Sequence, residues 1–141
     1  MWSPLTKTCI YLCDKKTKGT TEKLKKVLST TEDINEQTTL GSTALHFAAL
    51  GSNQDVVGTL LSAKADIIPN NNQETPLHWA CKAGSSKTIQ KLLRSLSPAM
   101  IQFKDASGKT AYDWATEYDR EDAQKLIQKT LARKNKRRGT L

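Results

Sequence analysis

The chain has 141 residues, of which 37% are hydrophobic and 26% are charged, and its formal net charge is +8. This length predicts one domain with room for a modest core. No apolar run approaches the roughly 18 residues of a membrane span, and the N-terminus lacks the charged and apolar regions of a secretory signal, so membrane and secreted classes are excluded.

The positive charge lies at the two ends of the chain. Residues 1–31 carry seven lysines and two acidic residues, and residues 125–141 carry seven basic residues and no acidic ones. Residues 32–124 carry eight basic and twelve acidic residues, so the body is mildly acidic. Nucleic-acid-binding domains usually place a basic stripe along the folded surface. The sequence does not predict such a stripe through the body.

The cysteines are few, and their spacing matches neither a zinc nor a redox motif. Cys9 and Cys13 are expected on one helix face, and Cys81 lies in a later segment. We expect all three to be packing residues in a reducing compartment, either the cytoplasm or the nucleus.

In chain order, the first expected helix lies within Pro4 to Lys16 and is poorly marked, and the second covers Gly19 to Leu28. A repeated pattern follows. Residues 43–48 (TALHFA) recur 32 residues later as 75–80 (TPLHWA), and more loosely 35 residues further on as 110–115 (TAYDWA). Residues 56–61, 88–93 and 123–128 repeat in the same register. Two segments that repeat in step predict tandem helix-turn-helix units.

The start of each unit has the signals of a helix N-terminus. Thr43, Thr75 and Thr110 are expected N-caps, because a hydroxyl can accept a hydrogen bond from the first turn. Pro76 suits the first helical position. Gly51 and Gly84 are expected to end the first helices with a positive φ. Small residues after each cap, such as Ala48 and Ala80, allow a neighbouring helix to approach closely.

These residues resemble the ankyrin repeat family, whose period is about 33 and whose pattern is T-P-L-H-x-A. The resemblance covers residues 40–128 and implies an all-α ankyrin-repeat solenoid of stacked helix-turn-helix units joined by hairpin loops. It departs from the family pattern where Lys64 and Gln73 replace glycines and where residues 94–103 are longer and contain Pro98. These departures affect loop geometry only.

We therefore expect about four repeats, with polar outer faces on the terminal ones. Gln124 and Gln128 replace the apolar residues of earlier units, which indicates that the array stops there. The expected division is an N-terminal capping repeat over 1–39, ankyrin repeats over 40–71 and 72–106, a C-terminal capping repeat over 107–131, and a disordered basic tail over 132–141.

The two histidines, His46 and His78, occupy the same repeat position. We expect them to tie one helix start to an adjacent loop, the role that the resemblance implies, rather than to catalyse a reaction. No nucleophile–base spacing, phosphate loop or metal-ligand cluster is present. We expect no enzyme activity, no cofactor and no metal.

Candidate partner-binding residues lie on the first helices and the hairpins, which form the concave binding surface in ankyrin-like stacks. The helical candidates are the aromatic positions and their neighbours: Phe47, Leu50, Trp79, Trp114 and Tyr118. The hairpin candidates are Leu40, Asn71, Asn72, Glu74, Ser107 and Lys109. The aromatic rings either contact a partner or pack half-buried between neighbouring helices, and the sequence leaves both interpretations open.

The expected function is non-catalytic recognition of another protein by a monomeric module acting as an adaptor, an inhibitor or an assembly chaperone. The alternative is a binder of nucleic acid or of an anionic membrane that uses both basic ends. The basic cluster in the tail is also a candidate nuclear localisation signal; it comprises Arg133, Lys134, Lys136, Arg137 and Arg138.

Overall fold

Each repeated unit begins its first helix at a threonine cap. The hydroxyls of Thr43, Thr75 and Thr110 accept hydrogen bonds from the backbone N–H three residues later. The side chain at that later position accepts a bond from the threonine N–H, which completes a capping box in all three units. The predicted N-caps are confirmed.

The structure is a computed structural model that describes residues 3–13, 20–51 and 53–139. These residues form helices and connecting loops, and none of them is in a strand. The helices are α1 (Pro4–Cys13), α2 (Thr20–Ser29), α3 (Ala44–Leu50), α4 (Gln54–Ser62), α5 (Pro76–Ala83), α6 (Ser86–Ser95), α7 (Pro98–Ile101), α8 (Ala111–Glu117) and α9 (Glu121–Gly139).

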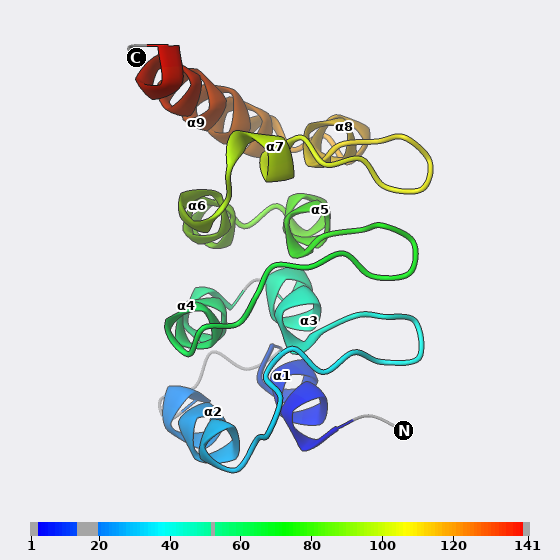
Figure 1. Ribbon diagram of the computed structural model, residues 1–141, viewed down its shortest axis with the longest axis vertical. Coiled ribbons are helices and arrows are strands. Elements are labelled where there is room, and N and C mark those ends of the chain that lie inside the picture. Colours follow the sequence, from blue (N-terminus) through cyan, green and yellow to red (C-terminus); the bar gives the residue numbers. More distant parts are fainter. Residues whose placement is uncertain (1–2, 14–19, 52, 140–141) are drawn as a thin grey trace.

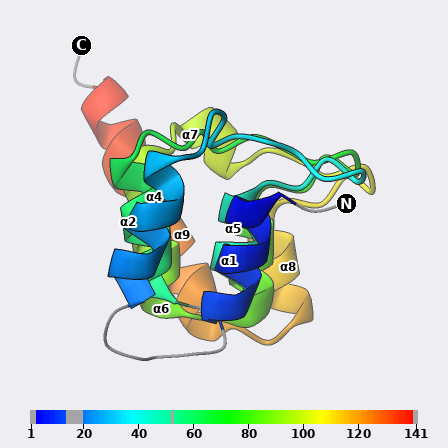
Figure 2. The ribbon, with the colours of Figure 1, turned by 90° about the horizontal axis from the view of Figure 1, so that it is seen from below.

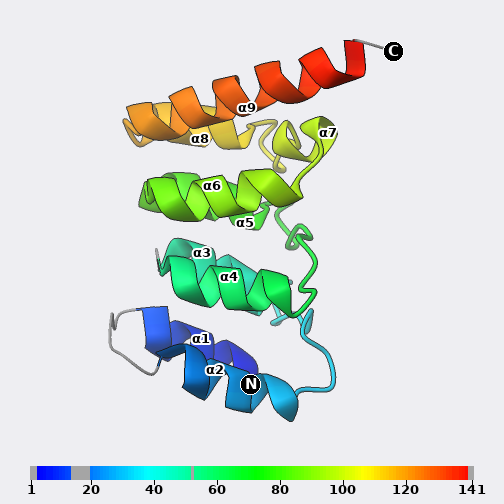
Figure 3. The same ribbon diagram turned by 90° about the vertical axis from the view of Figure 1, so that its left-hand side faces the viewer.

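The helices stack in pairs along one axis (Figures 1 and 3). The pairs are α1 with α2, α3 with α4, α5 with α6, and α8 with α9. The first helices form one column and the second helices another, so each helix packs on its equivalent in the next pair. The hairpin loops project from the same side at a steep angle to the helices, which gives each unit an L shape (Figure 2). The expected all-α solenoid is confirmed.

The core runs continuously between these layers. Small side chains let the first helices approach closely, and five of them are completely buried: Ala48, Ala49, Ala80, Cys81 and Ala115. The second helices contribute larger apolar residues, including Val56, Leu60, Ile89 and Leu92, which are also completely buried. Cys9 is likewise buried, so two of the three cysteines are packing residues. The side chain of Cys13 lies outside the described residues.

At three described positions the turns take the positive-φ conformation that glycine favours although another residue stands there, namely Lys64, Gln73 and Asp119, the last with a φ of 55°. Lys64 follows α4 with a φ of 70°, and Gln73 lies in a hairpin with a φ of 59°. Gly84 has the expected positive φ of 83°. The expectation for Gly51 was wrong, because its φ is −75°. Its N–H bonds to the carbonyl oxygen of Phe47 and so continues the helical pattern by one residue.

The two irregular regions near the C-terminus have physical explanations. The long third junction contains α7, a single turn that Ser97 caps and Pro98 begins. At the last pair, Gln124 donates a hydrogen bond to Thr116, and Gln128 donates one to the hydroxyl of Tyr112. Polar contacts thus replace the apolar contacts of the inner units, and the end of the array at this pair stays a prediction.

The chain beyond residue 131 differs from expectation. We expected a disordered tail over 132–141, but α9 continues through these residues to Gly139. Alanine, arginine and lysine are strong helix formers, and basic side chains near a helix C-terminus interact favourably with the helix dipole. The amine of Lys134 also donates a hydrogen bond to the carbonyl oxygen of Leu96, which ties this part of α9 to the end of α6.

Candidate functional site

The candidate site is the surface formed by the hairpins 37–43, 69–75 and 104–110 together with α3, α5 and α8; we call it the inner surface. Each hairpin closes with a backbone hydrogen bond, such as the 2.8 Å bond from the N–H of Thr38 to the carbonyl oxygen of Ser42. Neighbouring tips are also joined, because the N–H of Asn71 bonds to the oxygen of Leu40 and that of Ala106 bonds to the oxygen of Asn72. The hairpins therefore form one connected row.

Two hairpin contacts make this row tight. Gly41 has a φ of 82°, and a Cβ there would lie 2.8 Å from the backbone nitrogen of Asn71. The side-chain amide of Asn71 donates a hydrogen bond to the carbonyl oxygen of Thr39. Asn71 thus connects two hairpins. The side chains of Leu40, Asn72 and Ser107 are exposed, with Leu40 the most exposed large apolar residue of the described chain at 69%.

The aromatic positions pack between neighbouring units. The ring of Trp79 makes edge contacts with Phe47 at 5.4 Å and with His46 at 5.1 Å. Trp114 packs in the same way on His78 at 5.3 Å. Phe47 and both tryptophans are partly buried. The half-buried packing that the sequence left as one interpretation is thus present, and contact of these rings with a partner stays a prediction.

Both indole N–H groups are also satisfied within the chain. Trp79 donates to the carboxylate of Glu74 at 3.2 Å, and Trp114 donates to Asp105 at 2.9 Å. Burial by itself would raise the pKa of Asp105, but hydrogen bonds from Lys109, Trp114 and Ser107 lower it below its ordinary value. Glu74 therefore supports Trp79, and Asp105 supports Trp114 in the same way, a role that was not predicted from the sequence.

A second group of exposed side chains lies at the C-terminal ends of the first helices. Leu50 and Tyr118 are each 41% exposed. The amine of Lys82, at the end of α5, lies 5.6 Å from the centre of the Tyr118 ring. Tyr11 on α1 is 51% exposed, and the amine of Lys23 lies over its ring. Tyr11 was missed because the first helix of the chain carries too weak a repeat pattern to align.

The histidines connect consecutive units, as expected. Each Nδ1 lies 3.0 Å from the N–H of its capping threonine. Nε2 of His46 lies 2.8 Å from the carbonyl oxygen of Glu74, and Nε2 of His78 lies 3.0 Å from that of Lys109. Desolvation by burial lowers the pKa of His46 to about 4 and also lowers that of His78. Both rings are neutral structural links at neutral pH.

The described residues hold no group of three or more histidine, cysteine or acidic side chains placed to bind a metal ion. Burial raises the pKa of the Cys81 thiol to about 12, which removes its nucleophilic character at neutral pH. None of the helices in the described part of the chain has the length and apolarity that a membrane span requires.

The remaining candidate residues, on the third hairpin and on α9, have charged side chains. Lys109 forms an ion pair with Glu117 across the inner surface. On α9, the side chains of Arg133, Lys136 and Arg137 are exposed, whereas that of Lys134 is partly buried. The side chain of Arg138 lies outside the described residues. The basic cluster is therefore presented on a helix and not on an extended tail.

Comparison with known proteins agrees with this architecture. The family model described as ankyrin repeats (3 copies) matches residues 10–101 and, in a second match, residues 70–138. Among curated proteins, inversin from Canis lupus familiaris is 31% identical over 96 residues, which is 67% of this chain and 9% of inversin.

Other similar proteins are the tyrosine-protein kinase Shark from Drosophila melanogaster and the E3 ubiquitin-protein ligase KEG from Arabidopsis thaliana. Shark is 32% identical over 67% of this chain and 10% of its own length. KEG is 36% identical over 64% of this chain and 5% of its own length. The chain spans about a tenth or less of these relatives, so the likeness concerns one module within each of them. The matching family model, the capping boxes and the stacked helix pairs together show that the chain belongs to the ankyrin repeat family.

Proposed function

We propose that this chain is a non-catalytic module that binds a protein partner through its inner surface. Ankyrin repeats generally mediate protein–protein interaction. The observation that supports this surface is its combination of a rigid, hydrogen-bonded frame with exposed apolar side chains, namely Leu40, Leu50 and Tyr118. A frame that is already ordered loses little conformational entropy when a partner docks.

The tryptophans support the surface from within, because their indole groups are already bonded to Glu74 and Asp105. The contacts with a partner would instead come from the exposed side chains at the hairpin tips and at the helix ends. We therefore expect the contacts at the hairpin tips and at the helix ends, which are the two margins of the inner surface, with the half-buried aromatic rings between them. The adaptor, inhibitor and chaperone roles all use such a surface.

The net charge of the inner surface is close to zero. Its hairpins and first helices carry three basic and four acidic side chains, a net charge of −1. We therefore expect recognition at this surface to depend on apolar contacts more than on net charge.

The test is a quantitative comparison of the proteins captured from a cell extract by the parent and by three variants. Leu40→Ser combined with Tyr118→Ser should lose the captured partner, because it removes two exposed apolar contacts. The matched control Gln90→Ser changes an exposed residue on α6 and should retain the partner. A truncation after residue 131 should also retain it.

The opposite pattern would reject the proposal. Loss of capture on truncation, with the double variant unaffected, would favour the basic end of the chain as the binding element and hence nucleic acid or an anionic membrane. Thermal unfolding of each variant checks that a loss of capture does not come from unfolding, and exposed substitutions of this kind change stability little.

A further inference from the structure

The fold brings together charges that are far apart in the sequence. The second helices α2, α4, α6 and α9 lie side by side on the face opposite the hairpins (Figure 3). They carry 13 basic and 4 acidic side chains, a net charge of +9, which exceeds the +8 of the whole chain. The lysines of α2 and the basic residues of α9 thus lie in one layer with the basic residues of α6.

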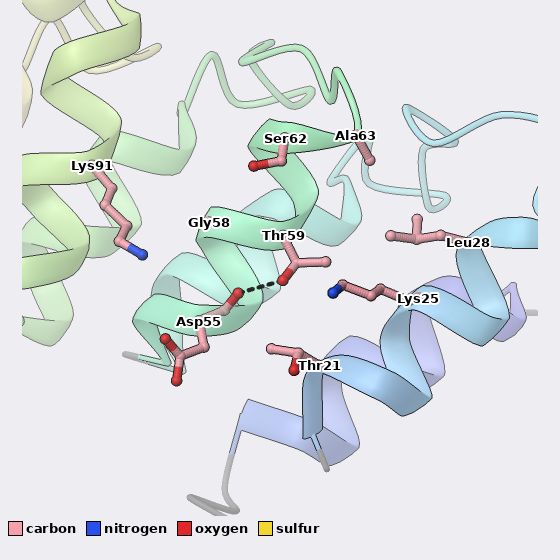
Figure 4. Close-up of a pocket in the computed structure, with 9 residues that line it drawn as sticks. All are labelled: Thr21, Lys25, Leu28, Asp55, Gly58, Thr59, Ser62, Ala63 and Lys91. Carbon is pink, nitrogen blue, oxygen red and sulfur yellow. Dashed lines mark hydrogen bonds between the residues drawn. The ribbon is translucent and has the colours of Figure 1, made fainter. Parts of the chain in front are cut away.

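This layer contains a groove of about 620 Å³ over α4 (Figure 4). Small residues of α4 and its C-cap residue form the floor, and α2 and α6 form the walls. The floor consists of Gly58, Thr59, Ser62 and Ala63. Lys25 of α2 and Lys91 of α6 approach the floor from opposite sides, as Figure 4 shows. Leu28 and Thr21 complete the wall on the α2 side.

Gly58 makes the groove open. A Cβ at this position would lie 2.7 Å from the amine nitrogen of Lys91. The glycine therefore lets the amine lie directly over α4, where it donates a 3.1 Å hydrogen bond to the main-chain oxygen of Gln54. An ammonium group has three donors, so Lys91 keeps two of them for a ligand. Glycine in a helix interior is less favourable than alanine, so this opening reduces the stability of α4.

The positive charge of Lys25, on the other wall, is only weakly balanced by a neighbouring acidic side chain. Lys25 lies 4.0 Å from Glu22, and both side chains are largely exposed. An exposed pair at that distance contributes little. Both walls of the groove therefore present a positive charge to a ligand, with the hydroxyl groups of Thr21 and Ser62 beside them.

We propose that this groove binds an acidic polypeptide segment of a partner protein. The site does not depend on the inner surface. Asp55 also lines the groove. A nucleic-acid backbone carries a negative charge at every step and would meet this carboxylate unfavourably, whereas a peptide can place an uncharged residue opposite it. The groove residues include no aromatic side chain on which a base could stack.

The test is a binding measurement on the full chain, with a short fluorescent peptide of alternating glutamate and serine as the probe. Lys91→Glu should weaken binding by roughly tenfold, because it reverses a charge at the groove. The matched control is Lys87→Glu. It makes the same charge change one turn earlier on α6, outside the groove, and should weaken binding much less.

A second variant tests the shape of the groove. Gly58→Leu fills the floor and improves helix propensity, so it should abolish peptide binding while the thermal midpoint stays equal or rises. Failure of the parent to bind the peptide would overturn the proposal. Equal losses for Lys87→Glu and Lys91→Glu, or peptide binding that survives Gly58→Leu, would do the same, because they would indicate attraction to net charge alone.

Parallel measurements address other ligands. Oligothymidylate of the same charge as the peptide, and vesicles that contain phosphatidylserine, should bind more weakly than the peptide. Tighter binding of either one that is lost in Lys91→Glu would assign the groove to nucleic acid or to membrane and would overturn the proposal.

Discussion

Acidification should destabilise the stack through its buried histidines. His46 is fully buried, and its pKa falls from the ordinary value of 6.5 to about 4 because burial disfavours the charged ring. Its Nδ1 accepts a hydrogen bond from Thr43, and its Nε2 lies against the carbonyl oxygen of Glu74. Only the neutral ring with its proton on Nε2 satisfies both contacts. A second proton on Nδ1 would place an N–H donor of the ring opposite the N–H donor of Thr43.

The direction and size of this change in the free energy of unfolding follow from the linkage between protonation and folding. The unfolded chain binds a proton at this ring below pH 6.5, whereas the folded chain does so only below about pH 4. The contribution of His46 to the free energy of unfolding is therefore complete above pH 6.5 and is lost as the pH falls from 6.5 to 4. The difference in pKa corresponds to about 3 kcal/mol. His78, whose pKa is also lowered, adds to the loss.

Urea unfolding followed by circular dichroism at a series of pH values measures this loss. The parent should lose stability steadily over the acidic range above pH 4. The variant His46→Gln should be less stable at neutral pH, because it loses a buried link, and its stability should depend less on pH. NMR titration of the histidine ring protons provides a direct check on the folded parent. A His46 ring that titrates near its ordinary pKa in the folded chain, or a parent stability that does not change with pH, would refute the reasoning.

Three further predictions concern single residues. Gly41→Ala should destabilise the fold by more than about 2 kcal/mol, because it adds a backbone clash with Asn71 to the strain of a positive φ. Gly108→Ala, where a Cβ meets nothing within 4 Å, should cost only about 1–2 kcal/mol of stability in urea unfolding. Equal costs for the Gly41 and Gly108 variants would contradict the contact between position 41 and Asn71. Lys64→Gly should raise the thermal midpoint, since the residue has a φ of 70°; a lower midpoint would mean that unfolded-chain entropy outweighs this strain. Cys81 should resist iodoacetamide until the chain unfolds, and rapid alkylation of the native protein would contradict its burial.

The features that the sequence predicts well are those determined within one unit. The capping threonine and the side chain three residues later lie in one turn of helix, so Thr43 and His46 could be paired from their spacing alone. The register of the second helices was also predictable, because apolar residues at helical spacing must face the core. The positive φ of Gln73 was not predicted, because its replacement of a hairpin glycine indicated altered loop geometry, whereas the residue keeps the conformation that glycine has in the neighbouring hairpins.

The features that the sequence did not predict depend on contacts between units. The rings of Phe47 and Trp79 lie 32 residues apart, and their spacing alone does not distinguish an exposed row from a packed one. The hydrogen bond between Trp114 and Asp105 likewise depends on how a hairpin folds back against the next helix. The helical form of residues 132–139 was missed because a dense basic cluster was treated as a solvated tail, although its residues favour helix.

The separation of charge between the two faces provides a last test, which concerns salt. At the groove, binding would depend on Lys25 and Lys91, whose charges lack strong partners among the residues that the structure describes, so the affinity for an acidic peptide should fall as salt screens them. At the inner surface, Lys109 is already paired with Glu117, and the proposed contacts are the apolar Leu40, Leu50 and Tyr118 together with uncharged polar side chains of the hairpins. Binding there should change little over the same salt range, because burial of apolar area is not screened. Measuring both affinities against ionic strength separates the two surfaces in one protein, and a steep salt dependence at the inner surface would show that charge, and not Leu40 or Tyr118, dominates recognition there.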